Sequence, residues 1–169
     1  MLCIFVGQSR TLLFKSFGSI EMSSIQIIVG SMLGSSEYVA ETMADTLREA
    51  GHKVHLHFKP VLNQVEVIDQ TWIICTSTHG AGELPDNLKT FAQSVEQMDN
   101  DLSSTKFAVI GLGDSGYDSF CQGAVIMEHL LSTKGCQKII DKLLIDGRDV
   151  GVDAEDKAES WIENNIALF

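Results

Sequence analysis

Short runs of apolar residues alternate along the chain with longer segments in which apolar residues recur at helical spacing. The apolar, β-branched runs predict five buried strands, at Ile25–Gly30, Val54–Phe58, Trp72–Thr76, Phe107–Gly111 and Ile139–Ile145. The amphipathic segments predict four helices, at Glu37–Ala50, Asp86–Met98, Ser119–Leu131 and Ala154–Leu168. Val61–Asp69 is too short to predict a helix. The alternation is typical of a parallel sheet that helices cover on both faces.

This pattern predicts an α/β fold of three layers, with a five-stranded parallel sheet in the order 2-1-3-4-5. Such sheets bind ligands beyond the carboxyl ends of the strands, where the strand order reverses, which here lies between the first and third strands. The 169 residues suffice for one domain, and we expect it to span residues 22–169. We expect residues 1–21 to be an N-terminal extension that is disordered or belongs to an over-extended start. The alternative is an extra element packed on the domain.

The chain has 12 basic and 23 acidic residues, which give a net charge of -11. This balance disfavours nucleic acid and anionic membranes as partners and favours basic proteins. The longest apolar run within the first 21 residues, Leu2–Val6, is far too short to span a bilayer. The four cysteines form no C-x-x-C pair, which fits a reducing compartment, so we expect a cytoplasmic protein.

The loop after the first predicted strand, GSMLGSSEYVAE from Gly30 to Glu41, is rich in hydroxyl groups and has no lysine or arginine. Its backbone N–H groups and the helix that begins near Glu37 can hold a phosphate. A triphosphate site would need the lysine of the pattern G-x-x-x-x-G-K-[ST], so the loop indicates a monophosphate held by neutral donors. A serine-rich helix cap without a ligand is the alternative.

The loop after the fourth predicted strand, GLGDSGYDSF from Gly111 to Phe120, contains the pattern G-x-G-x-x-G. In a dinucleotide site this pattern follows the first strand, and an acidic residue comes about 20 positions later, at the end of the next strand. Here the pattern follows the fourth strand, and the residues about 20 positions beyond Gly116 are Gly135-Cys136-Gln137. Tyr117 instead offers a flat ring that could stack on a planar ligand.

Together with STHGAGELPDN, from Ser77 to Asn87, these sequences resemble the three FMN-binding loops of the flavodoxin family, in particular those of its MioC-type short-chain members. The third loop, GLGDSGYDSFCQGA, is also similar to the FMN domains of diflavin reductases such as the sulfite reductase flavoprotein. The resemblance extends from Ser23 to the C-terminus and implies a flavodoxin-like fold. The chain departs from the family in two places: Ser-Met-Leu replaces a threonine-rich phosphate loop, and His79 stands where many members carry an aromatic residue.

The resemblance implies that FMN is the cofactor. The residues that would wrap its phosphate are Ser31, Met32, Leu33, Gly34, Ser35 and Ser36. The residues that would line the isoalloxazine ring are Ser77, Thr78, His79 and Gly80 on one face, and Leu112, Gly113, Asp114, Tyr117, Phe120 and Cys121 on the other. Gly80 is expected to face flavin N5, and Asp146 is a further candidate near the rim of the ring.

The resemblance also implies an electron carrier rather than a self-sufficient enzyme. It would pass single electrons from a separate, basic NADPH reductase of the flavodoxin or ferredoxin type to an acceptor enzyme that the sequence does not identify. The alternatives are a flavodoxin-like binding or regulatory module with weak or no FMN, and an FMN quinone reductase. We expect no catalytic residue, because the loops offer no nucleophile beside a paired base. We also expect no metal site, because the spacing of His52, His55 and His57 provides only two ligands on one strand face.

Overall fold

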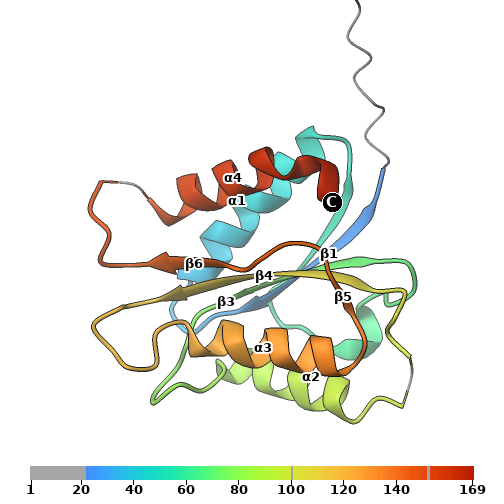
Figure 1. Cartoon of the computed structure of the whole chain (residues 1–169), viewed down its shortest axis with the longest axis horizontal. Coiled ribbons are helices and arrows are strands. Elements are labelled where there is room, and N and C mark those ends of the chain that lie inside the picture. The colour runs from blue at the N-terminus through green and yellow to red at the C-terminus, as the bar shows by residue number, and fades with distance from the viewer. Residues whose placement is uncertain (1–21, 100, 152) are drawn as a thin grey trace, which may run out of the picture.

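The computed structural model describes residues 22–99, 101–151 and 153–169, so the expectations for residues 1–21 lie outside it (Figure 1). The strands of one sheet are β1 (Ser24–Gly30), β2 (Lys53–His57), β3 (Thr71–Thr76), β4 (Lys106–Gly113), β5 (Gln137–Lys138) and β6 (Leu143–Asp146). The sheet has the order β2-β1-β3-β4-β5, β6 also pairs with β4, and all of these pairings are parallel. The predicted fold class and strand order are confirmed.

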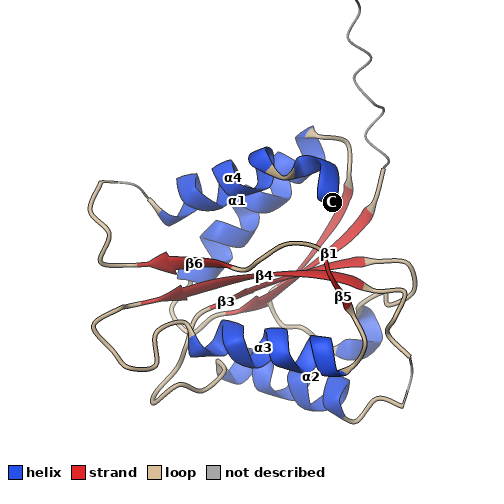
Figure 2. Cartoon of the chain, viewed as in Figure 1, coloured by secondary structure: helices blue, strands red, loops and turns tan. Residues whose placement is uncertain are grey.

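Helices cover both faces of the sheet and make the three layers visible in Figure 2. One face carries α1 (Ser35–Glu49) and α4 (Ala154–Asn164), and the other carries α2 (Asp86–Glu96) and α3 (Gln122–Thr133). Two short 3₁₀ helices, η1 (Leu62–Gln64) and η2 (Ile166–Leu168), follow β2 and α4. In the part of the chain that the structure describes, no helix has both the length and the apolar character that a bilayer crossing requires.

A buried apolar core lies between the sheet and the helices on each of its faces. The helical spacing of α1 brings Val39, Met43 and Leu47 to the sheet, where they are fully buried. On the opposite face, Trp72 of β3 packs against Phe91 of α2 with ring centroids 5.7 Å apart. Because the central strands are buried on both sides, they read as continuous apolar runs in the sequence.

The region of the predicted fifth strand, Ile139–Ile145, differs from the prediction. Two short strands, β5 and β6, take its place, and residues 139–142 separate them. Lys138 Nζ lies 2.9 Å from Asp141 Oδ1, and Lys142 Nζ lies 2.6 Å from Glu128 Oε2 on α3. Pairing with β4 is interrupted over residues 139–142 and resumes at Leu143, which pairs with Ile110.

Candidate functional site

A cavity of about 550 Å³ opens at the carboxyl edge of the sheet, which is the edge that the strand order predicts for a ligand. Its walls come from the loops after β1, β3, β4 and β6. Its volume lies within the range of about 300–1,000 Å³ that is usual for small-molecule sites. Four loops, which lead from the sheet to helices on both of its faces, therefore form one pocket at this edge.

Most of the predicted site residues line this cavity. They are Leu33, Ser35, Ser77, Thr78, Gly80, Leu112, Gly113, Asp114, Tyr117, Phe120 and Cys121. The predicted residues that do not line it are Ser31, Met32, Gly34, Ser36, His79 and Asp146. The cavity also has four lining residues that the sequence analysis did not include, Ser119, Ile145, Gly147 and Ala154. Three of these belong to β6 or follow it, in the region where the strand prediction was least accurate.

The loop after β1 leaves backbone donors free at the start of α1. Gly34 has a left-handed φ of 95° and no side chain caps the helix, so the N–H groups of Ser35 and Ser36 belong to the first turn and have no intrahelical acceptor. The loop itself is fixed by the N–H of Gly34, which donates to Ser31 Oγ at 2.9 Å, and by the N–H of Ser31, which donates to Asn87 Oδ1 at 3.1 Å. This arrangement suits an anion at the N-terminus of α1.

The side chain of Ser36 is not placed to bind a phosphate through its hydroxyl. Its side chain is fully buried, its Oγ has no hydrogen-bond partner among the described residues, and its carbonyl oxygen accepts from Cys75 Sγ at 3.4 Å. The hydroxyl is therefore turned into the protein, and only the backbone N–H of Ser36 is positioned by its place in the first turn of α1 to meet an anion.

The loop after β3 forms a tight turn between His79 and Glu83. The N–H of His79 donates to the carbonyl of Glu83 at 2.8 Å, and the N–H of Glu83 donates back to the carbonyl of His79 at 2.8 Å. Gly80 and Gly82 have positive φ values of 53° and 117°, which permit this reversal. As a result Gly80 lies at the cavity, whereas His79 does not line it.

The loop after β4 is held by hydrogen bonds of its own. Asp114 Oδ1 accepts the N–H of Gly116 at 2.7 Å, and Asp146 Oδ1 accepts the N–H groups of Ser115 at 3.1 Å and Arg148 at 3.0 Å. Hydrogen bonding by Ser115, and then by the N–H of Arg148, lowers the pKa of Asp146 below its usual value. Asp146 thus braces the loop behind the cavity instead of facing into it.

The two loops that flank the cavity are also joined to each other. Thr78 Oγ1 accepts the N–H of Gly123 at 3.1 Å, and a Cβ on Gly123 would come within 2.6 Å of the carbonyl oxygen of Ser77. A Cβ on Gly113 would meet the backbone nitrogen of Cys121 at 2.8 Å. Glycine at these two positions lets the backbones approach closely enough to form a continuous wall.

Cys121 explains why α3 begins later than predicted. It has a left-handed φ of 49°, which the helix interior excludes, so the helix starts at Gln122 instead of Ser119. Burial raises the pKa of the Cys121 thiol to about 11, which keeps it neutral at physiological pH. The wall that it forms with Leu112 and Ile145 is therefore apolar and uncharged.

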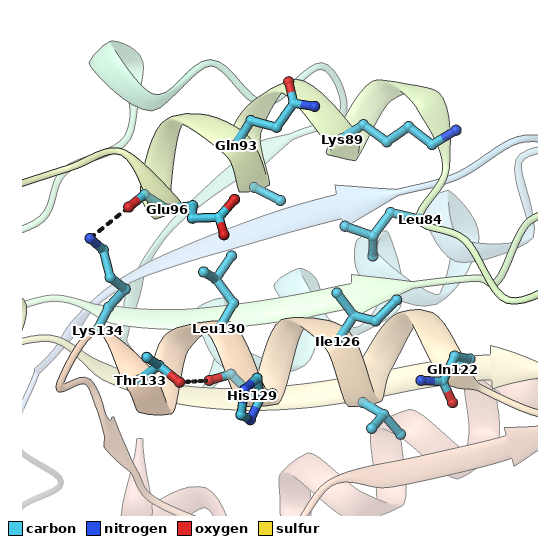
Figure 3. A pocket seen from close by; sticks show the side chains of 12 residues that line it. Leu84, Lys89, Gln93, Glu96, Gln122, Ile126, His129, Leu130, Thr133 and Lys134 are labelled. Carbon is cyan, nitrogen blue, oxygen red and sulfur yellow. Dashed lines mark hydrogen bonds between the residues drawn. The ribbon is translucent and has the colours of Figure 1, made fainter.

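A larger hollow of about 830 Å³ lies between α2 and α3 (Figure 3). Aliphatic side chains such as Ile126 and Leu130 line it, and at one end Lys134 Nζ donates to the carbonyl of Glu96 at 2.9 Å. It is a groove between two helices, and the residues that line it do not come from the loops after β1 or β4. Its size alone does not make it the better candidate for a phosphate-bearing ligand.

Comparison with known proteins agrees with this geometry. A family model described as flavodoxin matches residues 27–161. The chain belongs to the flavodoxin family. The MioC homolog of Haemophilus influenzae is 44% identical over 142 residues, which cover 84% of this chain and 96% of that protein. A solved flavodoxin variant from Pseudomonas aeruginosa aligns with a TM-score of 0.79 and 28% identity, covering 86% of this chain and 97% of the other.

The chain also matches part of a longer flavoprotein. The sulfite reductase (NADPH) flavoprotein alpha-component of Thiocapsa roseopersicina is 36% identical over 120 residues, which cover 69% of this chain and 23% of that protein. This flavodoxin-family chain is an FMN-binding electron-transfer protein. The cavity suits FMN, because it joins the donors at the start of α1 to an apolar wall of the kind that a flat ring requires.

Some of the carboxylates in and after the loop that follows β3 are paired with a cation. Lys89 Nζ lies 3.4 Å from Glu83 Oε2 and 2.9 Å from Asp86 Oδ1. The hydrogen bond from Lys89 lowers the pKa of Asp86 below its usual value. Asp118, next to the wall residue Tyr117, forms no ion pair within the described residues. The carboxylate of Asp118 therefore remains available to a partner.

Proposed function

We propose that this chain carries single electrons from a separate NADPH-dependent reductase, whose docking surface is basic, to an acceptor enzyme. The observation that carries the proposal is the cavity itself. It opens at the edge of the sheet, and its lining contains no nucleophile beside a paired base with which the chain could transform a substrate. The net charge of -11 favours a basic partner.

Within this proposal the two ends of FMN meet different parts of the chain. The loop Ser31–Ser36 would hold the phosphate, through the N–H groups of Ser35 and Ser36. The loop Ser77–Gly80 and the wall that contains Tyr117 and Cys121 would hold the ring. FMN would supply the redox chemistry, and the chain would orient it and keep the Cys121 thiol beside it neutral.

Two molecules of this chain are needed to carry the electrons of one NADPH. NADPH is oxidised to NADP⁺ and gives two electrons to the reductase. The reductase passes them on one at a time, so that one NADPH reduces two molecules of this chain by one electron each. Each molecule then gives its electron to an acceptor, which is reduced by one electron. The donor and the acceptor have to use the same exposed edge of the cavity in turn.

The test uses the full chain loaded with FMN. We expect FMN to bind with loss of its fluorescence, and we expect a flavodoxin reductase with NADPH to reduce cytochrome c much faster when the chain is present. A chain that does not take up FMN would overturn the proposal in favour of a binding module. A chain that oxidises NADPH by reducing a quinone without any reductase would overturn it in favour of a quinone reductase.

Salt provides a second measurement on the same system. The Debye length is about 8 Å at physiological ionic strength, so attraction between exposed charges across an encounter complex is screened. We expect the rate of reduction to fall with salt, and we expect Asp118→Asn to flatten this dependence while FMN binding stays the same. Asp99→Asn, a change at an exposed position after α2, serves as the matched control. An unchanged salt slope in Asp118→Asn would show that the partner docks elsewhere.

A further inference from the structure

The strand β2 lies at one edge of the sheet, and one of its faces is polar. Val54 and Leu56 pack into the core beneath α1, so the side chains of Lys53, His55 and His57 lie on the opposite face, because successive residues of a strand alternate. His55 is exposed and His57 is half-buried. Neither histidine lines the cavity at the carboxyl edge or the groove between α2 and α3.

A chain of three hydrogen bonds starts at the ring of His57. Its Nε2 lies 2.8 Å from Oε1 of Gln26, a residue of β1 that is almost completely buried. Gln26 Nε2 donates to Gln70 Oε1 at 3.1 Å, and Gln70 Nε2 donates to the carbonyl oxygen of Ile68 at 3.2 Å. These bonds connect β2, through β1, to the segment that precedes β3.

The far end of this chain of hydrogen bonds determines where the ring of His57 carries its proton. A backbone carbonyl can only accept, so Gln70 turns its NH₂ group to Ile68 and its oxygen to Gln26. Gln26 then turns its NH₂ group to Gln70 and its own oxygen to His57. That oxygen accepts the N–H of Nε2, so the neutral ring keeps its lone pair on Nδ1.

A histidine held in this way is oriented for binding a metal ion. Metal-binding histidines usually donate their second ring N–H to a protein oxygen, which fixes the tautomer and the orientation of the ring. Gln26 supplies that oxygen for His57. Burial, and to a smaller extent the proximity of His55, lower the pKa of His57, so the two rings are close enough to interact. Because His55 is exposed, its ring has room to turn toward an ion bound at Nδ1 of His57.

We propose that His55 and His57 form a site for a divalent transition-metal ion, which His57 binds through Nδ1. The described residues contain no cluster of three or more histidine, cysteine or carboxylate side chains that could hold a metal ion, so two histidines supply the protein ligands and water completes the coordination. Imidazole nitrogen suits Zn²⁺, Cu²⁺ and Ni²⁺, whereas Mg²⁺ and Ca²⁺ prefer oxygen ligands.

This inference goes beyond the expectation from the sequence, which was that no metal site is present. The sequence shows two histidines on one strand face, but not the buried amide of Gln26 that orients one of them. The inference does not depend on the proposed function, because neither histidine lines the cavity.

The test uses the full chain loaded with FMN, prepared without a polyhistidine tag, with Ni²⁺ alone as the probe. Ni²⁺ is paramagnetic and broadens the NMR signals of nearby nuclei. We expect the backbone amides of β2 and the side-chain amide of Gln26 to broaden at the lowest Ni²⁺ concentrations. His55→Ala and His57→Ala should each raise the half-saturating concentration at least about tenfold, since the loss even of a group that only orients a ligand costs that much.

Two further measurements sharpen the test. His129→Ala is the matched control, because it removes a histidine from α3 and leaves β2 as it is, so Ni²⁺ binding should not change. The second measurement needs no metal ion. In mildly alkaline buffer, where the ring is neutral, the ¹⁵N chemical shifts of His57 should be those of the tautomer with its proton on Nε2.

Three results would overturn the inference. The first is a proton on Nδ1 of His57 in the metal-free chain. The second is broadening of other regions at lower Ni²⁺ concentrations than β2, or an equal loss of binding in His129→Ala. The third is unchanged binding in His55→Ala, an exposed substitution that keeps the test decisive even if His57→Ala, which leaves Gln26 Oε1 without its donor, fails to fold. None of these results concerns electron transfer, so the proposed function stands or falls separately.

Discussion

The loop after β1 and the loop after β4 border the same cavity but use their backbone donors differently. At the start of α1 no side chain caps the helix, so the N–H groups of its first turn remain for a ligand. In the loop after β4, the carboxylates of Asp114 and Asp146 accept the N–H groups of Gly116 and Ser115. The first loop is built to receive an anion, whereas the second uses its donors to fix its own shape.

The two loops also differ in how tightly they are packed. A Cβ on Gly34 would find its nearest neighbour, the ring of Tyr38, at 4.0 Å. A Cβ on Gly113 would lie 2.8 Å from the backbone nitrogen and 2.9 Å from the Sγ of Cys121. The comparison teaches that one site can combine an open, donor-rich loop for the charged end of a ligand with a dense, apolar wall for its ring.

The largest effect is expected when the dense wall is overfilled. Gly113→Ala would push a methyl group against the backbone of Cys121, which cannot turn away as a side chain could. We expect the free energy of unfolding to fall by about 2–3 kcal/mol, the upper part of the range for overpacking. FMN affinity should fall with it. Urea denaturation and a fluorescence titration measure the two effects.

Gly147→Ala is the matched control for this prediction. Its Cβ would find the carbonyl oxygen of Gly113 at 3.5 Å, an ordinary contact, and Gly147 is not among the glycines with a positive φ. We expect its stability to stay within about 0.5 kcal/mol of the unmodified chain. Equal stability of the two variants would show that the wall yields more easily than its packing implies.

A smaller effect is expected for Ser31→Ala, and it should differ between a ligand with a phosphate and one without. Ser31→Ala removes the hydroxyl that accepts the N–H of Gly34, and it should loosen only the loop that holds the phosphate. We expect FMN affinity to fall about tenfold, or ~1.4 kcal/mol, and riboflavin, which has no phosphate, to bind as before. Isothermal titration with both ligands measures this difference.

Thr78→Val provides the counterpart on the ring side. It leaves the N–H of Gly123 without its acceptor, Thr78 Oγ1, while the volume of the side chain is kept. We therefore expect it to weaken FMN and riboflavin by similar factors. If Ser31→Ala weakened riboflavin as strongly as FMN, the division of labour between the two loops would be wrong.

The sequence was sufficient for the strand order and for the edge at which the cavity forms. The central strands are continuous apolar runs such as Ile25–Gly30, and α1 repeats its buried residues at helical spacing, so local pattern and tertiary packing agree there. The glycine-rich loops at Gly80 and Gly113 were also recognisable, because few other residues permit such turns and close approaches.

The features that escaped prediction depend on partners that are distant in sequence. The break between β5 and β6 includes Lys142, which pairs with Glu128 on α3, and the local pattern does not identify this partner. Gly147 and Ala154 reach the cavity because β6 ends beside β4. The resemblance places Ser36 among the residues that would wrap the phosphate, but it does not reveal that its hydroxyl is buried on α1. The pattern of apolar and polar residues identifies the helices and strands, but it does not show which side chains a neighbouring helix or strand will cover.

The smallest effect concerns Asp146, the carboxylate that braces the dense wall from behind. Because hydrogen bonding by Ser115 and by the N–H of Arg148 lowers the pKa of Asp146, its charged form stabilises the folded chain. That contribution is present at pH values above the ordinary carboxyl pKa of about 3.9 and is lost as the pH falls through the lower pKa of the folded state. Asp146→Asn cannot lose a charge in this way.

We therefore expect Asp146→Asn to have a lower Tm than the unmodified chain at pH 7, and we expect this difference to shrink when the pH falls below about 4. Thermal denaturation of both proteins between pH 7 and pH 3 measures it, and the partial exposure of Asp146 to solvent keeps the difference small. A difference that stayed constant over this range would mean that shape, and not charge, is what Asp146 contributes. In either case the phosphate loop lies elsewhere, so the ratio of FMN to riboflavin affinity should remain that of the unmodified chain, in contrast to Ser31→Ala.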